Sequence, residues 1–548
     1  MGIIKELRRT AAVAGLTIAF ACAVSLAEEA RYDVLIRGGT VIDGSGGPGF
    51  AADVGVRDGK IVFVGSGAES GAETLIDASG LVVAPGSIDP HNHADISLEE
   101  PGNRLVANFI HQGVTTLVGG PDGWYAPSVI RKFKDNFGGG GLGPNLALYV
   151  GHNGIRKEVM GNARRPPTGE ELARMRALVR EGMKLGAVGL STGLMYEPGM
   201  FSDTDEVAAL AEEVASFGGI YDSHVRDPVN AFLDSHAEVI EIGRRAGIPV
   251  KLGHLKGVAL HNEGLIGQVI AMVDKARLEG RVVVSDQYPY DGAATALLND
   301  VVVVPREQVV TDPSAARIEP ARLKELLRNP AQRLRLKEAS ENGIDGGFAW
   351  LKVTGYDAMR VVFAPDNPQL VGRYLIHIAE ERSVEPFDAI ADLIIENDRS
   401  IRVTLGAVTE EDVRTLLVQP WNMICSDGLY VGKEGSDNTH PRSTGSFSRI
   451  LGHYTRELGL LSLPEAVRKM TSLPADFLRL YDRGRIATGK VADIVVFDAA
   501  RIAARSTWAE PNLYPIGIDH VIVNGVAVLR DGELTGKRPG RFIERQSR

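Results

Sequence analysis

The sequence predicts an α/β protein, a (β/α)8 TIM barrel joined to a small β-sandwich that is built from both ends of the chain. Three observations predict this fold. Short apolar runs alternate with amphipathic helical patterns through the middle of the chain. The two flanks instead alternate apolar and polar residues around Gly-Asp and Asp-Gly pairs, which are typical of hairpins. Histidine and aspartate residues follow several of the apolar runs, as expected at the catalytic rim of a barrel.

Eight apolar runs are candidates for the barrel strands. Up to the seventh, their ends lie roughly 30 to 40 residues apart, which leaves room for one helix between neighbouring strands. A longer stretch separates the seventh run from the eighth, so we expect an insertion near 296–370. The runs are LVVAPGSID (81–89), VTTLVGG (114–120), LALYVGH (146–152), AVGLSTG (187–193), GGIYDSH (218–224), IPVKLGH (248–254), VVVSDQY (282–288) and WNMICSDG (421–428).

Two flanking segments surround the predicted barrel, which occupies residues 84–480. Residues 28–83 and 481–548 contain short strand patterns and turns, such as ADVGVRDGKIVFVGSG and HVIVNGVAVLRDGEL. Neither flank alone has enough strands for a stable sheet. We therefore expect the two flanks to pair into one small β-domain beside the barrel.

The first residues have the order of a secretory signal peptide. Lys5, Arg8 and Arg9 precede the apolar run AAVAGLTIAFACAV, and the small residues SLA follow it. We expect cleavage after Ala27, so that residues 1–27 are removed and the mature protein is secreted or periplasmic. An uncleaved anchor is the alternative, but the run is short for a transmembrane helix. No stable membrane insertion is expected after cleavage.

Composition excludes several classes of protein. Hydrophobic residues make up 44% and charged residues 24% of the 548 residues, as in an ordinary soluble globular protein. The formal net charge is −10 and no long basic run is present, which argues against nucleic acid as a partner. The only cysteines are Cys22 and Cys425, and Cys22 would leave with the signal peptide. The mature chain therefore has no internal disulfide and no cysteine-rich metal site.

Side chains that can bind a metal gather at the predicted strand ends, where barrel enzymes carry their active sites. Imidazole and carboxylate groups suit Zn²⁺ or a related divalent ion. His91 and His93 alternate along one strand, so their side chains point the same way and can reach one ion. The residues at the strand ends are His91, His93, Asp122, His152, His224, His254, Tyr288 and Asp427, with Lys256 just beyond His254.

Each of these residues also has a simpler interpretation. A single histidine at a strand end is more often an ordinary hydrogen-bonded residue, and only the whole set favours a metal. Asp427 can act as a general base at the strand-eight position, although an isolated Ser-Asp-Gly is usually a turn or cap. Cys425 is better interpreted as a small buried residue than as a nucleophile.

The chain resembles the amidohydrolase superfamily, and within it the D-aminoacylase (N-acyl-D-amino-acid deacylase) family. The His-x-His after the first barrel strand is the mark of the superfamily, and several blocks in order resemble the narrower family. These blocks are GHNGIR (151–156), GAVGLSTGLMYEPGMFSDTDEV (186–207), SHVRD (223–227), GHLKG (253–257), DQYPY (286–290), SDGLY (426–430), HPRSTGSFSRILGHYTRELGLLSLPEAVRKMTSLPA (440–475) and ADIVVFD (492–498).

The resemblance implies a metal-dependent enzyme that hydrolyses the amide bond of N-acyl-D-amino acids, with one or two divalent ions, Zn²⁺ foremost. It implies that His224 and His254 hold the tightly bound ion, that His91 and His93 hold a second and weaker one, and that Asp427 is the acid/base. It also implies that three residues hold the carboxylate and carbonyl of the small N-acyl amino acid substrate. These are Lys256, Tyr288 and Arg442.

Two positions depart from the family pattern. The family usually has a cysteine metal ligand after strand two, whereas this chain has Asp122 there. A carboxylate is a harder ligand than a thiolate and can bridge two ions, so the number and identity of the metals stay open, as does a plain turn role for Asp122. Ala294 occupies a place where the family often has a serine, so one polar contact to the substrate is absent.

Other functions stay open beside the main one. The same rim could open a cyclic amide, as in hydantoinase- or dihydroorotase-like proteins, but those more often use a carboxylated lysine and strand four ends here without one. A dipeptidase for peptides with a D-residue is harder to separate from a deacylase. A catalytically inactive barrel is disfavoured because the histidines and Asp427 are all present.

Overall fold

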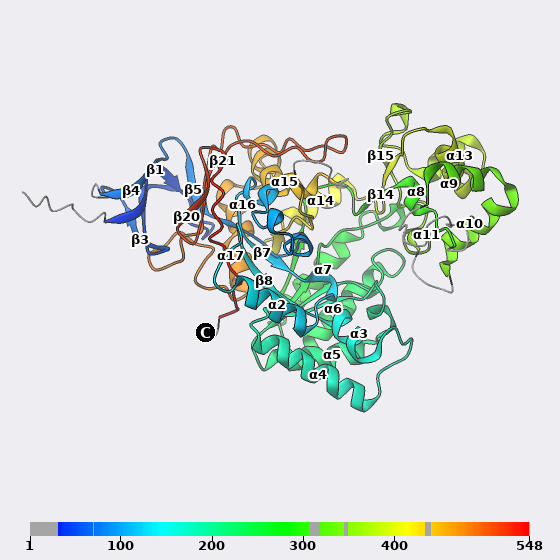
Figure 1. Ribbon diagram of the computed structural model, residues 1–548, viewed down its shortest axis with the longest axis horizontal. Coiled ribbons are helices and arrows are strands. Elements are labelled where there is room, and N and C mark those ends of the chain that lie inside the picture. The colour runs from blue at the N-terminus through cyan, green and yellow to red at the C-terminus, as the bar shows by residue number, and fades with distance from the viewer. Residues whose placement is uncertain (1–30, 69–70, 306–317, 345–348, 433–439, 547–548) are drawn as a thin grey trace, which may run out of the picture.

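The computed structural model describes residues 31–68, 71–305, 318–344, 349–432 and 440–546. The predicted signal peptide, residues 1–27, lies outside them. Within the described ranges, no helix combines the length and apolar character needed to cross a membrane. Figure 1 shows three parts in a row: a β-domain at one end, the barrel in the middle and a mostly helical insertion at the other end.

Eight parallel strand positions form the barrel, and its strands are buried throughout. Two arcs of hydrogen-bonded strands meet where β8 and β9 follow one another along the same strand position. The (β/α)8 barrel predicted from the apolar runs is confirmed. The first arc is β6 (Ser87–Asp89), β7 (Val114–Gly119) and β8 (Asn145–Leu148), and the second is β9 (Val150–Gly151), β10 (Gly189–Gly193), β11 (Ile220–His224), β12 (Val250–Leu252), β13 (Val283–Gln287) and β17 (Asn422–Ile424).

The ends of β6 and β17 meet and close the barrel. The backbone amide of Asp427 donates to the carbonyl of His91 at 2.9 Å, and the amide of His93 donates to the carbonyl of Gly428 at 2.8 Å. Below them the buried Asp89 carboxylate accepts hydrogen bonds from the hydroxyl and the amide of Ser426, at 2.5 and 3.1 Å. The first and last barrel strands are therefore joined at the rim.

Amphipathic helices surround the strands. Helix α4 illustrates why they form: Thr168 and Glu171 make a reciprocal capping box at its start, and Met175, Val179 and Met183 face the core at helical spacing. The helices of this layer are α1 (Ala107–Ile110), α2 (Pro127–Phe137), α3 (His152–Met160), α4 (Gly169–Lys184), α5 (Thr204–Ala215), α6 (Phe232–Ala246), α7 (Ile266–Leu278), α14 (Glu410–Leu417), α15 (Arg442–Arg449), the π-helical turn Ile450–Glu457, α16 (Leu463–Met470) and α17 (Ser472–Phe477).

The small β-domain combines strands from both ends of the chain, as predicted. It is one nine-stranded sheet whose two halves join where β5 pairs antiparallel with β18. Residues of both halves, such as Val54 and Ile494, share one buried core. The strands are β1 (Tyr32–Val41), β2 (Phe50–Arg57), β3 (Lys60–Gly65), β4 (Ala72–Asp77), β5 (Val82–Pro85), β18 (Ile494–Phe497), β19 (Ile518–Val523), β20 (Val526–Arg530) and β21 (Glu533–Leu534).

The insertion between β13 and β17 has a core of its own, which runs from Leu298 to Leu405. The insertion is longer than the predicted 296–370. Its strand β14 pairs with β16, and the helices α12 and α13 pack within the same core. Its elements are β14 (Thr295–Leu297), α8 (Leu298–Val301), α9 (Pro320–Arg328), α10 (Pro330–Asn342), α11 (Trp350–Thr354), β15 (Val361–Phe363), α12 (Leu375–Arg382), α13 (Pro386–Glu396) and β16 (Arg402–Thr404).

A buried ion network lies inside the barrel below the rim. Lys251 on β12 is fully buried, and its ammonium group pairs with Asp286 and, at 3.3 Å, with Asp222. It also donates to the carbonyl of Pro90 at 2.8 Å. Burial lowers the pKa of Lys251, but the two carboxylates outweigh it and hold the pKa well above its ordinary value. The charged lysine therefore links β11, β12 and β13 to the segment that precedes His91.

We expect Lys251→Met to destabilise the barrel strongly, because it leaves Asp222 and Asp286 buried without a counter-charge. The expected loss in the free energy of unfolding is about 3–5 kcal/mol. Lys132→Met is a matched control, since Lys132 pairs with Glu99 at an exposed site and should cost no more than about 1 kcal/mol. Denaturant titration measures both variants, and equal losses would contradict the role given to Lys251.

Candidate metal centre

The candidate ligands come from the C-terminal ends of four barrel strands. His91 and His93 follow β6, Asp122 lies in the short turn after β7, His224 ends β11 and His254 follows β12. The backbone at Asp122 and His254 is left-handed, with φ of 58° and 36°. Such conformations are costly for residues other than glycine and are concentrated at functional sites.

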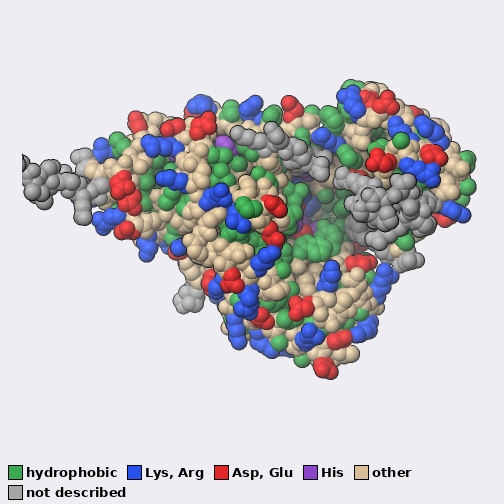
Figure 2. Space-filling model, viewed as in Figure 1, with side chains coloured by type: hydrophobic (Ala, Val, Ile, Leu, Met, Phe, Trp, Pro, Cys, Tyr) green, Lys and Arg blue, Asp and Glu red, His purple; other side chains and the backbone are tan. Residues whose placement is uncertain are grey.

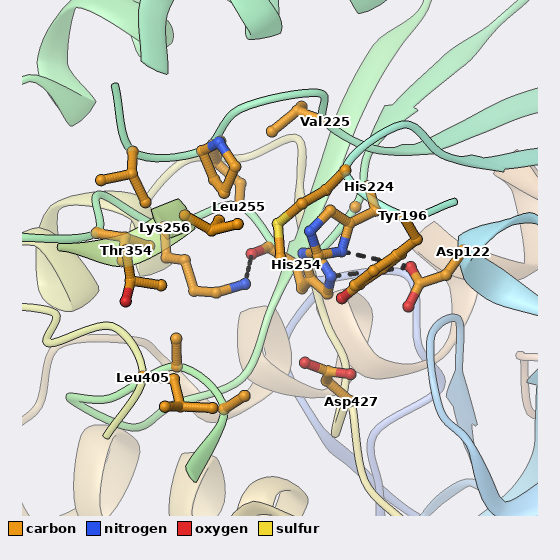
Figure 3. A pocket seen from close by; sticks show the side chains of 18 of the residues that line it. Asp122, Tyr196, His224, Val225, His254, Leu255, Lys256, Thr354, Leu405 and Asp427 are labelled. Carbon is orange, nitrogen blue, oxygen red and sulfur yellow. Dashed lines mark hydrogen bonds and ion pairs between the residues drawn. The ribbon is translucent and has the colours of Figure 1, made fainter. Parts of the chain in front are cut away.

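The Asp122 carboxylate lies at the centre of the four histidines. Its Oδ1 atom is 3.6 Å from His224 Nδ1, 3.8 Å from His91 Nε2 and 4.0 Å from His254 Nε2. Its Oδ2 atom is 3.6 Å from His93 Nε2. Figure 3 shows dashed lines that join Asp122 to His224 and His254. The structure therefore brings together all five predicted metal ligands.

Asp427 follows β17 and faces the same cluster. Its Oδ1 atom is 3.1 Å from His93 Nε2 and 3.7 Å from His91 Nε2, and its Oδ2 atom pairs with the guanidinium of Arg442. Burial raises the pKa of Asp427, but the adjacent Arg442 outweighs it and leaves the pKa well below the ordinary range. The carboxylate is therefore ionised at neutral pH.

The pKa shifts of the histidines bear on whether they can bind a metal ion. Burial and the nearby Lys251 lower the pKa of His91 to about 4, and burial holds the pKa of His254 well below its usual value. Both imidazoles are therefore neutral, as a ligand must be. Burial also disfavours the charged form of His93, but Asp427 and Asp122 outweigh it and raise the pKa to about 9. An ion that binds His93 displaces a proton.

Unpartnered buried atoms test whether these residues fit a divalent ion. Among the described residues, both ring nitrogens of His91, Nδ1 of His224 and Oδ1 of Asp122 are buried without a hydrogen-bond partner. Such atoms cost free energy unless something binds them. Three overlapping groups have ligand atoms within 4.8 Å of one another, which fits a shared ion: His91–His93–Asp122, His91–His254–Asp427 and Asp122–His224–His254.

The predicted substrate residues line the cavity next to this cluster. Lys256 donates to the carbonyl of His254 at 2.7 Å, and burial lowers the pKa of Lys256 to about 8. The ammonium of Lys256 and the guanidinium of Arg442 lie 5.2 and 4.7 Å from the ring centre of Tyr288. Burial raises the pKa of Tyr288, so its hydroxyl stays protonated. The three residues thus form one wall with two cations.

Sequence analysis did not identify several residues that line the cavity, and it placed at the barrel rim one histidine, His152, that does not line the cavity. His152 lies in α3, pairs with Glu206 at 2.8 Å and does not line the cavity. The missed residues include Tyr196, whose ring lies 4.9 Å from that of His224 and whose block after strand four was a signal of its place. The others come mainly from the insertion, where no sequence motif marks them: Trp350, Val353, Thr354 and Leu405.

Comparison with known proteins identifies the family. The model described as the amidohydrolase family matches residues 382–529. The D-aminoacylase of Alcaligenes xylosoxydans xylosoxydans is 32% identical over 95% of this chain and 99% of its own length. This chain belongs to the D-aminoacylase family of amidohydrolases. It is accordingly a hydrolase of amide carbon–nitrogen bonds.

Two further members of the family are similarly close to this amidohydrolase. The N-acyl-D-glutamate deacylase of the same organism is 32% identical over 94% of this chain and 97% of its own length. A solved N-acyl-D-glutamate deacylase from Bordetella bronchiseptica, in complex with zinc and a phosphonate mimic of the tetrahedral intermediate, has 30% identity and a TM-score of 0.71, and the match covers 94% and 99% of the two chains. Sequence identity therefore does not separate the substrates of these relatives.

We expect His224→Ala to lower the metal content of the purified protein, because it removes one of the ligands around the buried Asp122 oxygen. His453→Ala is the control, since His453 pairs with Glu457 on the surface. Elemental mass spectrometry of the dialysed proteins measures the ions per chain, with one or two expected in the wild type. Equal metal content in the two variants would exclude His224 as a ligand.

Proposed function

We propose that this protein hydrolyses the amide bond of N-acyl-D-amino acids and releases a carboxylate and the free D-amino acid. The observation that carries the proposal is the placement of an ionised Asp427 between the histidine cluster and the cationic wall of Lys256 and Arg442. We infer that Zn²⁺ is the ion, since imidazole and carboxylate ligands suit it and the solved relative contains it. The pattern of residues 1–27 supports a secreted or periplasmic location.

We assign acid–base catalysis to Asp427. His91, His93, Asp122, His224 and His254 would hold one or two divalent ions, which would lower the pKa of water and polarise the scissile carbonyl. Asp427 is ionised and its Oδ1 atom faces His93, so it can take the proton of the attacking water. The same carboxyl group then returns that proton to the leaving nitrogen.

The cationic wall suits the carboxylate of the substrate. Arg442 has a planar fork of donors that can pair with both oxygens of a carboxylate, and its pairing with Asp427 uses only part of that fork. Lys256 adds a second positive charge on the same side of the cavity. Tyr288 lies between them and offers a protonated hydroxyl to the carbonyl oxygen as negative charge develops there.

The rest of the cavity favours an apolar amino-acid side chain. Figure 2 shows the surface hollowed between the insertion and the barrel, with hydrophobic side chains around the hollow. Apart from the site residues already described, the lining includes the neutral, buried His236 and many apolar groups. Among the described residues that line the cavity, an acidic side chain would meet no further lysine or arginine. The apolar lining includes Met195, Val225, Pro228, Val229, Leu255, Val258, Ala293, Ala294, Trp350, Val353 and Leu405.

We expect the zinc-loaded enzyme to hydrolyse N-acetyl-D-methionine, and Asp427→Asn to lower kcat by about 10²–10⁴-fold because the variant cannot accept a proton. The same assay should include N-acetyl-L-methionine, a D-residue dipeptide and a hydantoin, which separate deacylase from dipeptidase and cyclic-amidase activity. Metal content should stay at the wild-type value in Asp427→Asn. Full activity of this variant, or faster cleavage of the hydantoin, would contradict the proposed reaction.

We expect Val353→Arg to shift preference toward N-acetyl-D-glutamate, because Val353 is half-buried in the cavity wall and the new cation can pair with the substrate side chain. The expected rise in kcat/KM for the glutamate relative to the methionine substrate is about tenfold, the value of one charge-assisted hydrogen bond. Val371→Arg is the control, since Val371 is 48% exposed and lies outside the cavity. A wild type that prefers the glutamate substrate would overturn the apolar assignment.

A further inference from the structure

We propose that an aromatic shelf beside the ligand cluster binds the acyl group of the substrate and selects large, apolar, uncharged acyl groups. The shelf consists of Tyr196, which lines the cavity, and Trp124, whose ring lies next to that of Tyr196 and is exposed to solvent. The inference rests on the proposed function for the reaction and for the position of the substrate carboxylate. It deepens that function by naming the acyl part of the substrate.

The position of Tyr196 opposite the cationic wall indicates where the acyl group lies. The acyl half and the carboxylate half of an N-acyl amino acid extend in opposite directions from the scissile amide bond. Lys256 and Arg442 are the proposed partners of the carboxylate. The ring of Tyr196 lies 4.9 Å from that of His224, and Figure 3 shows Tyr196 and Lys256 on opposite sides of His254. The acyl half therefore points toward Tyr196.

Trp124 continues the aromatic surface from Tyr196 toward solvent. The two ring centres lie 5.5 Å apart, with 34° between the ring planes, and Trp124 is 46% exposed. A tryptophan with this exposure leaves much of its apolar surface in water, so packing of the core does not explain its place. Two neighbouring aromatic rings offer flat apolar faces to a chain or ring that extends out of the cavity.

The backbone that carries Trp124 is held firmly against the start of α3. The amide of Gly151 donates to the carbonyl of Tyr125 at 2.7 Å. A Cβ atom at Gly154 would lie 2.5 Å from the carbonyl oxygen of Trp124, so only glycine fits at that position. The indole is therefore attached to a fixed backbone. Such preorganised surfaces lose less entropy when a ligand binds.

Two further exposed apolar side chains follow neighbouring strands at the same rim. Ile96 is 61% exposed in the turn after His93, and Leu429 is 41% exposed two residues after Asp427. The strands that precede Leu429, Ile96 and Trp124 are β17, β6 and β7, which are neighbours in the closed barrel. Exposed apolar groups on three successive loops of one rim suit an apolar ligand.

The charges of the site favour an acyl group without an ammonium group. A dipeptide has an ammonium next to the scissile carbonyl, whereas a fatty or aryl acyl group has none. Among the described residues that line the cavity, the carboxylates are those of Asp122 and Asp427. The first is a proposed metal ligand and the second pairs with Arg442. An ammonium near the divalent ion would therefore find both carboxylates of the lining already engaged, which disfavours it.

The experiment compares N-octanoyl-D-methionine with N-acetyl-D-methionine in the zinc-loaded enzyme. We expect kcat/KM to be about tenfold higher for the octanoyl substrate, because its chain reaches both rings of the shelf. Trp124→Ala should remove most of this preference, and Trp124→Phe should retain it because phenylalanine keeps an aromatic face. Phe50→Ala is the matched control, since Phe50 is 43% exposed on β2 of the small β-domain and should leave both rates unchanged.

A second pair of substrates tests the charge of the acyl group. L-Leucyl-D-methionine and N-(4-methylpentanoyl)-D-methionine differ only in the ammonium group next to the scissile carbonyl. We expect kcat/KM to be at least about tenfold higher for the uncharged substrate, because the ammonium must lose its water near a divalent ion. Faster cleavage of the leucyl dipeptide would overturn the selection of uncharged acyl groups.

The remaining outcomes separate the shelf from the proposed function. Equal kcat/KM for the acetyl and octanoyl substrates, or an unchanged preference in Trp124→Ala, would overturn the shelf while leaving amide hydrolysis in place. If the enzyme cleaves neither substrate, calorimetric binding of N-octanoyl-D-methionine decides. Binding that weakens about tenfold in Trp124→Ala would contradict the proposed reaction and leave the shelf standing, whereas binding that does not depend on Trp124 would overturn the shelf as well.

Discussion

The pairing of the first barrel strand with the last is the constraint on which the site depends. Two backbone hydrogen bonds, from Asp427 to the carbonyl of His91 and from His93 to the carbonyl of Gly428, join segments that are far apart in the sequence. These backbone contacts place Asp427, the proposed general base, beside the histidines. Deeper inside the barrel, the hydroxyl of Ser426 donates a hydrogen bond to Asp89 and joins the same two strands a second time. The catalytic spacing is thus a property of barrel closure.

The polar groups inside the barrel lie at two levels, one at the rim and one below it. Below the rim, the buried Lys251 pairs with the buried carboxylates of Asp222 and Asp286. At the rim, nitrogen atoms of His91 and His224 and an oxygen of Asp122 are buried without a hydrogen-bond partner among the described residues. Lys251 also favours neutral His91, so the positive charge below helps to keep a ligand nitrogen unprotonated. The network therefore stabilises the fold and prepares the ligands.

The sequence predicted the barrel, the small β-domain and the convergence of the ligands, because strand ends in a parallel barrel must meet at one rim. It could not predict the cavity wall formed by Val353 and Leu405, since those positions depend on how the insertion packs. The insertion extends beyond the predicted 296–370, because residues of α12 and α13 belong to its core. His152 follows a strand as the ligands do, yet α3 begins at that residue and turns it toward Glu206.

The insertion contributes to the substrate cavity while keeping a core separate from that of the barrel. A substitution in this lobe that alters the shape of the cavity therefore acts on a core that contains none of the proposed metal ligands and does not contain Asp427. This separation makes the protein modular in an evolutionary sense. New substrate preferences can arise by drift in one lobe, at little risk to a chemistry that resides in another.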